Sequence, residues 1–460
     1  MLKNDRIRKG MHVVVMGLGI SGRAAVRYLL GCGARVSVSD ARDRAKMKKE
    51  DLDFLETSGV SLESGGHSID LLGQADMIML SPGIPFDLPV LQEVKKRRIP
   101  VLGELAIAGP ALDARVIAIT GTNGKTTVTS LIGELLQQAG KKVFVGGNIG
   151  VPLFEHLVNG KAVDAVVLEV SSFQLETADS FRPDVALLLN ITPDHLDRHG
   201  DMDGYAAAKK RIFLHQRPGD TAILGGDDPL CRKMAAELKQ PSLFFGQGSD
   251  CQARTGQDAV VLNLDGAEEI YPLAGTELAG NTGVLNSAAA ILAVRAVGCR
   301  PEDIRKGLAR FKPGPHRLAR VGEIDGVCFY DDSKATNTGA VLSALRQLDG
   351  NIVLIAGGRD KGDNYSLLRE AVIEKVRKLV LIGEAADKIA AALQETVPIC
   401  YAASMDEAVE MAAQGAWPGD SVLMSPACSS FDMFDNYGHR GRVFTQAVQR
   451  LKGLRGELPR

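Results

Sequence analysis

The chain alternates short apolar runs with segments of helical periodicity along nearly its whole length. The runs are rich in Val, Ile and Leu, and they include HVVVMG, ARVSVSD, DMIMLSPG, RVIAITG, KVFVGGN, AVVLEVSS, VALLLN, NIVLIAGG, KLVLIG and SVLMSPA. Strands that are apolar on both faces and separated by helix-length segments are typical of parallel sheets covered by helices on both sides. The pattern therefore predicts an α/β fold.

The apolar runs fall into three groups, which predict three domains over residues 1–103, 104–313 and 314–460. The boundary between the second and third groups lies in RFKPGPHR, where proline and glycine indicate a linker. Within the central domain, the region between Leu214 and Tyr271 contains short strands and turns (AILGGDDP, LFFGQG, AVVLNLDG). This region predicts a small antiparallel appendage on a parallel sheet.

The amino-acid composition limits the kinds of molecule that this protein is expected to bind. The 460 residues are 45% hydrophobic and 24% charged, which is ordinary for a globular protein, and 54 Lys and Arg against 56 Asp and Glu give a net charge of −2. This balance argues against a nucleic-acid surface and against a basic membrane patch. No apolar run approaches the roughly 18 residues of a membrane span, and the seven cysteines form no CxxC pair. We expect a cytoplasmic monomer without structural disulfides or zinc.

The segment VIAITGTNGKTT predicts a strand that leads into a phosphate-binding loop and a helix. Backbone N–H groups of such a loop and the positive end of the helix bind phosphate oxygens, and a lysine neutralises their charge. Gly121, Gly124, Lys125 and Thr126 have the required spacing, and the Thr126 hydroxyl suits Mg²⁺. Ile119 occupies the first glycine position of GxxxxGK[ST], so the match is to GxxGKT only. An ordinary strand–helix turn is the alternative, but the helix-forming VTSLIGELLQQ that follows favours the phosphate site.

A second glycine loop, GLGISG, places Gly17, Gly19 and Gly22 in GxGxxG spacing after HVVVM. Asp40 ends the next strand, which completes the pattern of an NAD-binding fingerprint. Because the same geometry binds other nucleotide diphosphates, two functions stay open at this point. One is an NAD-dependent dehydrogenase, and the other is an ATP-using ligase whose substrate is itself a nucleotide diphosphate. A P-loop switch or motor ATPase would have no use for this first loop.

Three further residues of the central domain suit phosphate chemistry. Glu169 ends the apolar run in DAVVLEVSS, where a carboxylate can hold Mg²⁺, although an acidic helix cap is the alternative. His195 follows the strand VALLLN, and a structural histidine is the alternative. Lys209 lies in YAAAKKRIF, which also fits the basic side of an amphipathic helix, and spacing alone does not distinguish it from Lys210.

Charged and hydroxyl side chains also follow strands in the third domain. The segment YDDSKATN contains Asp332, Lys334 and Thr336, AGGRDKG contains Lys361, and SPACSSFDMFDNYGHRG contains Ser430. Hydroxyls, backbone amides and a lysine at strand ends suit a small dicarboxylate. Turns with solvated charges are the alternative.

Seven motifs together resemble the Mur ligase family: GTNGKTT, GGNIG, EVSSFQLE, TPDHLDRHG, HRLARV, YDDSKATN and SPACSSFDMFDNYGHRG. The resemblance covers nearly the whole chain, and the last two motifs are similar to those of members that add D-glutamate. It implies a Rossmann-like N-terminal domain, a central P-loop ATPase-type domain and a Rossmann-like C-terminal domain. It also implies an ATP- and Mg²⁺-dependent ligase of peptidoglycan synthesis, which joins D-glutamate to UDP-N-acetylmuramoyl-L-alanine through an acyl phosphate.

The resemblance assigns residues to four sites. It implies an ATP site at Gly121, Thr122, Asn123, Gly124, Lys125, Thr126, Thr127, Asn286, Arg317, Asp332 and Lys334, with metal ligands Thr126, Glu169 and His195. The UDP-substrate site is implied at Gly19, Ile20, Ser21, Asp40, Arg42, Ser81 and Asn148. The D-glutamate site is implied at Thr336, Lys361, Ser430 and Phe431. The implied catalytic residues are Lys125, Glu169, His195 and Lys209, and Lys209 matches a lysine that is carbamylated in the family.

One segment departs from the family pattern. The family usually has HNxxN beside the adenine, whereas TGVLN here has Thr282 and Gly283 in place of the His-Asn pair and retains Asn286. We therefore expect adenine recognition to depend on other groups.

Overall fold

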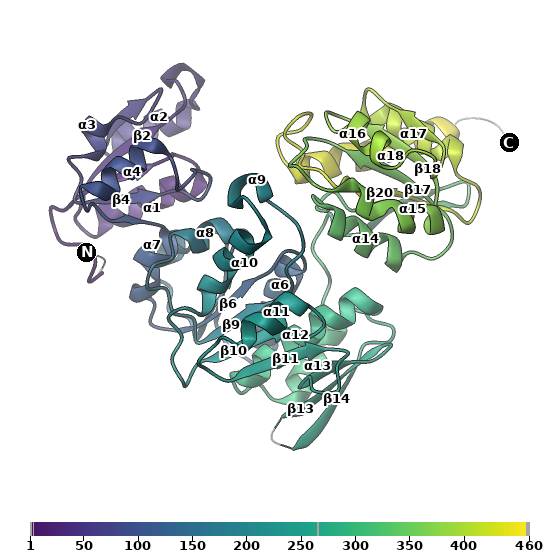
Figure 1. Cartoon of the computed structure of the whole chain (residues 1–460), viewed down its shortest axis with the longest axis horizontal. Coiled ribbons are helices and arrows are strands. Elements are labelled where there is room, and N and C mark those ends of the chain that lie inside the picture. The colour runs from purple at the N-terminus through teal and green to yellow at the C-terminus, as the bar shows by residue number, and fades with distance from the viewer. Residues whose placement is uncertain (1, 3, 265, 457–460) are drawn as a thin grey trace. The chain divides into compact units, whose positions relative to one another are not determined.

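The computed structural model describes residues 2, 4–264 and 266–456 (Figure 1). In this part of the chain the strands form three largely parallel sheets, which confirms the predicted α/β class. By its contacts the chain divides into two compact bodies, one formed by the described residues of 1–191, 203–278 and 284–311, the other by those of 192–202, 279–283 and 312–460. We call them the first body and the second body. The domain boundaries at residues 103 and 313 stay predictions.

The first sheet belongs to the first body and has the order β3-β2-β1-β4-β5, with each neighbouring pair parallel. Its strands are β1 (His12–Met16), β2 (Arg35–Asp40), β3 (Ser61–Ser64), β4 (Met77–Leu80) and β5 (Val101–Leu102). The helices of this segment are α1 (Ile20–Gly31), α2 (Lys49–Thr57), α3 (Ile69–Leu72), α4 (Pro89–Lys96) and α5 (Glu104–Ala108). Every residue of β1 and β4 is buried, as expected for strands covered on both faces.

The central sheet has the order β14-β13-β12-β11-β10-β9-β6-β8-β7 in the described residues. Its strands are β6 (Arg115–Thr120), β7 (Val143–Gly147), β8 (Ala165–Glu169), β9 (Val185–Leu188), β10 (Thr221–Gly225), β11 (Ser242–Gly246), β12 (Ala253–Thr255), β13 (Ala259–Leu264) and β14 (Ala267–Pro272). The accompanying helices are α6 (Lys125–Gln138), α7 (Leu153–Asn159), α8 (Ser172–Glu176), α9 (Leu196–His199), α10 (Met202–Lys210), α11 (Pro229–Ala235), α12 (Asn281–Ala296) and α13 (Pro301–Arg310).

The antiparallel appendage is confirmed for β12–β14, but it begins later than the sequence predicted. The segments AILG and LFFG belong to β10 and β11, which pair in parallel and extend the main sheet. Helix α11 makes the crossover that a parallel pair requires. A turn at residues 226–227 follows β10, and Asp228 then caps α11 by accepting hydrogen bonds from the backbone N–H groups of Leu230 and Cys231.

The third sheet lies in the second body and has the order β15-β16-β20-β17-β18-β19, antiparallel only between β15 and β16. Its strands are β15 (Ala319–Ile324), β16 (Val327–Asp331), β17 (Ile352–Gly357), β18 (Val376–Ile382), β19 (Ile399–Tyr401) and β20 (Ser421–Met424). Its helices are α14 (Thr338–Gln347), α15 (Arg369–Lys375), α16 (Ala386–Ala392), α17 (Met405–Gly415) and α18 (Tyr437–Gly456). Short 3₁₀ turns occur in the chain at Arg44–Lys46, Gly109–Ala111, Arg211–Phe213 and Tyr365–Leu368.

Strand β17 shows why its sequence is apolar at every position. Ile352 and Leu354 point into a hydrophobic cluster with α14, α15 and α16, whereas Val353 and Ile355 point into a second cluster with α17 and α18. Successive side chains of a strand face opposite sides of the sheet, so a strand covered on both sides must be apolar throughout. The continuous apolar runs of the sequence have this cause.

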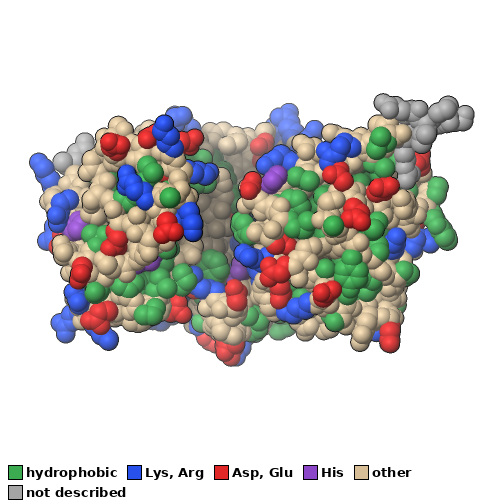
Figure 2. Space-filling view, turned by 90° about the horizontal axis from the view of Figure 1, so that it is seen from above, with side chains coloured by type: hydrophobic (Ala, Val, Ile, Leu, Met, Phe, Trp, Pro, Cys, Tyr) green, Lys and Arg blue, Asp and Glu red, His purple; other side chains and the backbone are tan. Residues whose placement is uncertain are grey.

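The described surface has mixed charge. On the face shown in Figure 2, Lys and Arg side chains are interspersed with Asp and Glu side chains. Among the residues that the structure describes, no helix combines the length and the apolar character needed to cross a membrane.

Glu104, at the predicted boundary between the first two domains, is a buried carboxyl group. Its exposed fraction is 2%, and its Oε1 accepts a hydrogen bond of 2.9 Å from the backbone N–H of Phe154 in the first turn of α7. Its Oε2 has no hydrogen-bond partner among the described residues. Burial raises the pKa of Glu104 from 4.5 to about 7, so the folded protein favours the protonated acid.

We predict that Glu104→Gln makes the protein relatively more stable as the pH rises. Because the folded pKa lies above the unfolded one, the stability that the wild-type carboxyl contributes is complete below pH 4.5 and is lost as the pH rises toward about 7. The neutral amide does not lose stability in this way. The melting temperature of the variant minus that of wild type should therefore increase between pH 5 and 8. Glu302→Gln, whose side chain is 55% exposed, is the control. A difference that does not change with pH would contradict the prediction.

Candidate active site

Each sheet carries a glycine-rich loop at the carboxyl end of one inner strand. The loop GLGISG follows β1, which lies between β2 and β4. The loop GTNGKTT follows β6, between β8 and β9, and AGGRDKG follows β17, between β18 and β20. In parallel α/β sheets, ligands bind where the crossovers leave such a strand in opposite directions. The topology therefore places three candidate binding loops.

The first loop needs its glycines for close packing. Gly17 has φ +85°, and a Cβ at Gly22 would lie 2.0 Å from the carbonyl oxygen of Gly17. Ser81, at the end of β4, donates a hydrogen bond of 2.9 Å to that same carbonyl. Gly19 has open space around the position of a Cβ, and Ile20 is 77% exposed at the start of α1. The loop thus leaves the N-terminus of α1 accessible.

The carboxylate of Asp40 holds this loop together. It accepts four hydrogen bonds, one from the backbone N–H of Leu18 (2.7 Å) and three from Arg42 (2.9–3.0 Å). The hydrogen bonds from Arg42 hold the pKa of Asp40 well below its usual range. Arg42 also donates to the carbonyl of Leu18. A ribose hydroxyl would have to displace these bonds, which disfavours the dehydrogenase alternative.

The second loop has the geometry of a phosphate cradle. Gly124 adopts φ +85° at the N-cap of α6, and Lys125 donates through Nζ to the carbonyls of Gly121 and Thr122, both at 2.8 Å. Asn190, just after β9, fixes the loop by accepting from the backbone N–H of Asn123 (2.9 Å) and donating to its carbonyl (3.1 Å). A Cβ at Gly124 would lie 2.6 Å from Oδ1 of Asn286, so α12 approaches the loop closely there.

Three predicted site residues meet at the end of β8. Glu169 is 2% exposed, and its Oε2 accepts from the Thr126 hydroxyl at 2.5 Å. Its Oε1 accepts from the amide of Asn148 at 2.8 Å. Thr127 follows in the first turn of α6. A hydroxyl and a carboxylate beside a phosphate loop are the oxygen ligands that Mg²⁺ prefers, so this pair fits a divalent cation. No group of three or more His, Cys, Asp or Glu in the described ranges is arranged to hold a metal.

Lys209 is buried against the same loop. Its side chain on α10 is 1% exposed, and Nζ donates to the carbonyl of Gly121 at 2.8 Å. Nζ also lies 4.4 Å from the centre of the Tyr205 ring, whose hydroxyl is 3.2 Å from Oγ1 of Thr122. Lys210, the alternative that spacing left open, pairs instead with Glu237 on the exposed side. The tertiary structure thus distinguishes the two lysines.

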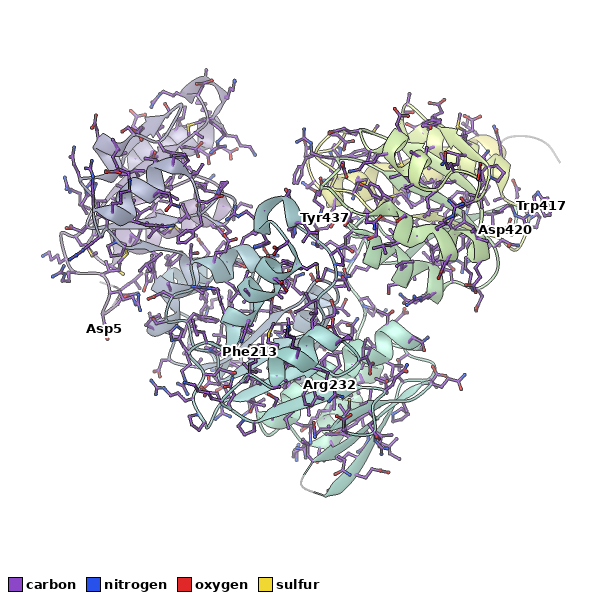
Figure 3. The ribbon with its side chains drawn as sticks, in the orientation of Figure 1. Asp5, Phe213, Arg232, Trp417, Asp420 and Tyr437 are labelled. Atoms are coloured by element: carbon purple, nitrogen blue, oxygen red, sulfur yellow. The ribbon has the colours of Figure 1, made fainter. Side chains whose placement is uncertain are left out.

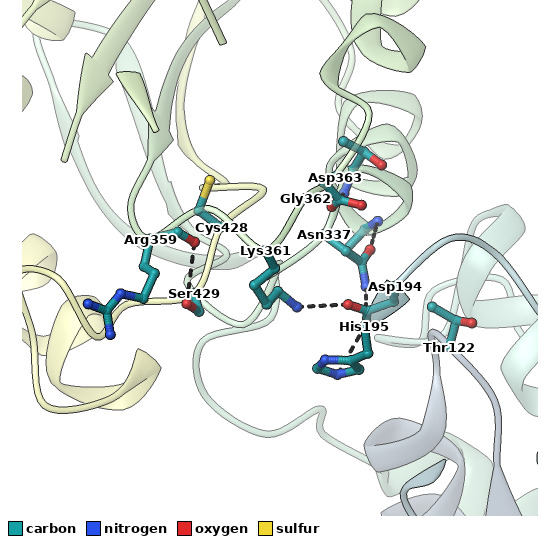
Figure 4. Close-up of polar contacts among 12 residues, drawn as sticks. Thr122, Asp194, His195, Asn337, Arg359, Lys361, Gly362, Asp363, Cys428 and Ser429 are labelled. Carbon is teal, nitrogen blue, oxygen red and sulfur yellow. Dashed lines mark hydrogen bonds and ion pairs between the residues drawn. The ribbon is translucent and has the colours of Figure 1, made fainter. Parts of the chain in front are cut away.

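In the second body, Lys361 forms an ion pair with Asp194, with Nζ 2.7 Å from Oδ1 (Figure 4). The neighbouring His195 has φ +55° at the N-cap of α9, and its Nε2 lies 3.6 Å from Oδ2 of Asp194. Asn337 donates to the same Oδ2 at 3.2 Å. Neither Asp194 nor Asn337 was predicted from the sequence as a site residue, although both lie inside the motifs TPDHLDRHG and YDDSKATN.

Arg440 joins two other loops of the second body. Its guanidinium is fully buried and donates to the carbonyls of Ser333, Cys428 and Ser429. It therefore ties the loop that contains Lys334 to the loop that contains Ser430. This role could not be predicted from the sequence, because a buried arginine in a helix has the same sequence pattern as a surface arginine of an amphipathic helix.

The remaining predicted residues lie around these loops. Asp332 accepts from the hydroxyl of Ser425 (2.8 Å) and from the backbone of Leu318, and removal from solvent raises its pKa to about 7. Lys334 lies over the ring of Tyr437, at 3.8 Å from its centre.

Thr336 and Arg317 are half-buried, Ser430 is buried and Phe431 is exposed. Thr282, in the segment TGVLN that departs from the family pattern, has its hydroxyl oxygen 2.8 Å from the hydroxyl oxygen of Ser343.

Comparison with known proteins agrees with the motifs. Residues 11–103 match the model of the Mur ligase MurD-like N-terminal domain, residues 119–294 the Mur ligase middle domain, and residues 316–428 the Mur ligase glutamate ligase domain. The UDP-N-acetylmuramoylalanine–D-glutamate ligase of Desulfotalea psychrophila is 50% identical over 98% of this chain and 99% of its own. The enzyme of that name from Koribacter versatilis is 43% identical over 96% and 98%.

Solved structures share the fold. The pseudomurein peptide ligase type C of Methanothermus fervidus aligns with a TM-score of 0.62 and 20% identity over 96% of this chain and all of its own. The UDP-N-acetylmuramate-alanine ligase of Thermotoga maritima aligns with a TM-score of 0.59 and 18% identity over 96% and 100%. The motifs, the family models and the full-length relatives agree: the chain belongs to the Mur ligase family.

Proposed function

We propose that this protein is the ATP-dependent ligase that joins D-glutamate to UDP-N-acetylmuramoyl-L-alanine in peptidoglycan precursor synthesis. The observation that carries the proposal is full-length identity of 50% to a relative with that name. The two phosphate-type loops support it, because the reaction uses two nucleotides, one as the handle of the substrate and one as the phosphoryl donor.

The reaction has two steps. An oxygen of the L-alanine carboxylate attacks the γ-phosphorus of ATP, which breaks the bond to ADP and gives an acyl phosphate. The amine of D-glutamate then attacks the acyl carbon, and the tetrahedral adduct expels phosphate to form the amide while the amine loses its proton. Activation is required because a carboxylate oxygen is a poor leaving group until it is phosphorylated.

We assign the phosphoryl donor to the second loop. Gly121, Thr122, Asn123, Gly124, Lys125, Thr126 and Thr127 would cradle the phosphates, and the N-terminus of α6 points into this loop. Lys125, which now donates to two carbonyls, would transfer these hydrogen bonds to phosphate oxygens. Asn286, Arg317, Asp332 and Lys334 are the other proposed nucleotide residues.

Thr126, Glu169 and His195 are the proposed Mg²⁺ ligands, and the contact between Thr126 and Glu169 fits that role. Bound Mg²⁺ would neutralise charge that develops on the phosphate oxygens. In the protein without a bound cation, Glu169 accepts hydrogen bonds from the Thr126 hydroxyl and the Asn148 amide and so holds both groups in fixed positions.

The two substrates have separate proposed sites. Gly19, Ile20, Ser21, Asp40, Arg42, Ser81 and Asn148 would bind the UDP-linked substrate, with Arg42 held by Asp40 as the cation for the diphosphate. Thr336, Lys361, Ser430 and Phe431 would bind D-glutamate, with Lys361 pairing one of its carboxylates. We propose that the protein works as a monomer in the cytoplasm, where ATP and nucleotide-linked sugars occur, without nucleic-acid or membrane partners.

A substrate panel tests the proposal directly. Phosphate should be released from ATP in the presence of UDP-N-acetylmuramoyl-L-alanine and D-glutamate together. D-Alanine lacks one carboxylate and would leave buried donors unpaired, so its kcat/KM should be at least about 10³-fold lower. L-Glutamate should also fail, because with both carboxylates anchored its amine points away from the acyl carbon. Preferential ligation of L-alanine, L-lysine or meso-diaminopimelate would refute the assignment.

Lys125→Ala should abolish ligation and leave binding of the UDP substrate unchanged. Two hydrogen bonds of the lysine go to carbonyls of the second loop, whereas the UDP site is assigned to the first. Loss of a charge-assisted contact to the transferred phosphoryl group should lower kcat by about 10³-fold or more. Calorimetry with the UDP substrate is the control measurement. If the variant lost affinity for this ligand as well, the two-site assignment would be wrong.

Lys209 should act as a carbamate. An ammonium next to Mg²⁺ would repel the cation, whereas a carbamate would attract it. The carbamate forms when the ammonium loses one proton, the resulting amine adds CO₂, and a second proton leaves. Activity should therefore fall in rigorously CO₂-depleted buffer and recover with bicarbonate, and Lys209→Met should be inactive. Lys210→Met, on the exposed neighbour, should retain activity. Full activity of Lys209→Met would exclude the role.

A further inference from the structure

One short segment belongs to a different body from the sequence on either side of it. Strand β9 and residues 203–278 are part of the first body, but Thr192–Met202 is assigned by its contacts to the second body. This segment contains the motif TPDHLDRH and the proposed metal ligand His195. The side chains of residues 192–202 are therefore expected to contact the rest of the second body.

Asp194 makes two polar contacts between this segment and other loops of the second body. Its Oδ1 accepts from Nζ of Lys361 at 2.7 Å, and its Oδ2 accepts from the amide of Asn337 at 3.2 Å (Figure 4). The side chains of Asp194 and Lys361 are only 8% and 15% exposed. Water screens a sequestered pair much less than a surface pair, and removing one member leaves the other charge buried without compensation.

The partners of Asp194 are themselves fixed. Asn337 is the N-cap of α14, and its Oδ1 accepts from the backbone N–H of Ala340 at 2.9 Å, which directs its Nδ2 group toward Asp194. The next residue, Thr338, donates its backbone N–H to Asp363 at 3.0 Å, two residues beyond Lys361. The start of α14 and the loop after β17 therefore form one preformed receptor for the Asp194 carboxylate.

We propose that Asp194 is a positioning residue with two effects. It fastens the 192–202 segment to the second body, and it holds the ammonium of Lys361 in place for a carboxylate of the amino-acid substrate. An ammonium has three N–H donors, so Lys361 can keep its bond to Asp194 while it donates to a substrate. The second effect rests on the proposed function, since it takes Lys361 as part of the D-glutamate site, whereas the first does not.

Hydrogen exchange on the ligand-free protein tests the fastening. Asp194→Asn removes the charge at constant shape, and Lys361→Met removes the cation at similar length. Each should speed amide exchange in residues 192–202 by about tenfold or more, and the double variant should exchange no faster than the single ones, because both remove the same interaction.

Asp420→Asn is the matched control. It breaks the ion pair between Asp420 and Arg377 (2.8 Å), which is in the same body and has a similarly buried carboxylate, 6% exposed. Asp420 lies beside Trp417, at the start of β20 and thus away from the carboxyl-end loops (Figure 3). The control should leave exchange in residues 192–202 unchanged. Equal exchange in wild type and Asp194→Asn, or equal acceleration in the control, would overturn the fastening.

Kinetics test the second effect. Asp194→Asn should raise the KM for D-glutamate by about tenfold or more and change the KM for ATP less than about twofold, whereas a merely structural defect would alter both or only lower the active fraction. An unchanged KM for D-glutamate would overturn this effect. If the wild-type protein ligated no D-glutamate at all, the proposed function would fail, and the exchange experiment would still decide whether Asp194 fastens the segment.

Discussion

The chemistry of this protein depends on one constraint of parallel sheets: a loop is left open at the carboxyl edge only where crossovers depart from a strand in opposite directions. Strands β1, β6 and β17 are the strands at which this happens. Each is flanked by two parallel neighbours, and each is followed by a glycine-rich loop. The same rule, applied three times along one chain, places three candidate binding loops.

Polar neighbours hold three cations in or beside these loops in the ligand-free protein. Asp40 holds Arg42, Asp194 holds Lys361, and backbone carbonyls hold Lys125. A charge that is partly removed from water is energetically costly unless it is paired. Each cation therefore has a partner within the protein when no ligand is bound. These contacts hold the three cations in fixed positions in the ligand-free protein.

The division into bodies does not follow the order of the chain. Residues 192–202 and 279–283 come from the middle of the sequence but belong to the second body with the third sheet. Both segments touch α14 or its N-cap, through Asp194 with Asn337 and through Thr282 with Ser343. The segment that replaces the usual adenine motif is thus a structural contact of the second body, which gives Thr282 a role that does not involve a nucleotide.

The sequence alone determined the α/β class, the three glycine loops and the family, because these depend on local patterns: continuous apolar strands, loop spacing and motifs. It also located Glu169 and Lys125 at strand and helix ends. Only the tertiary structure decided which of Lys209 and Lys210 faces the phosphate loop, that β10 and β11 extend the parallel sheet, and that Asp194 and Arg440 join distant loops. These facts involve groups far apart in the chain, whose contacts depend on packing, and no periodicity or spacing within the sequence encodes them.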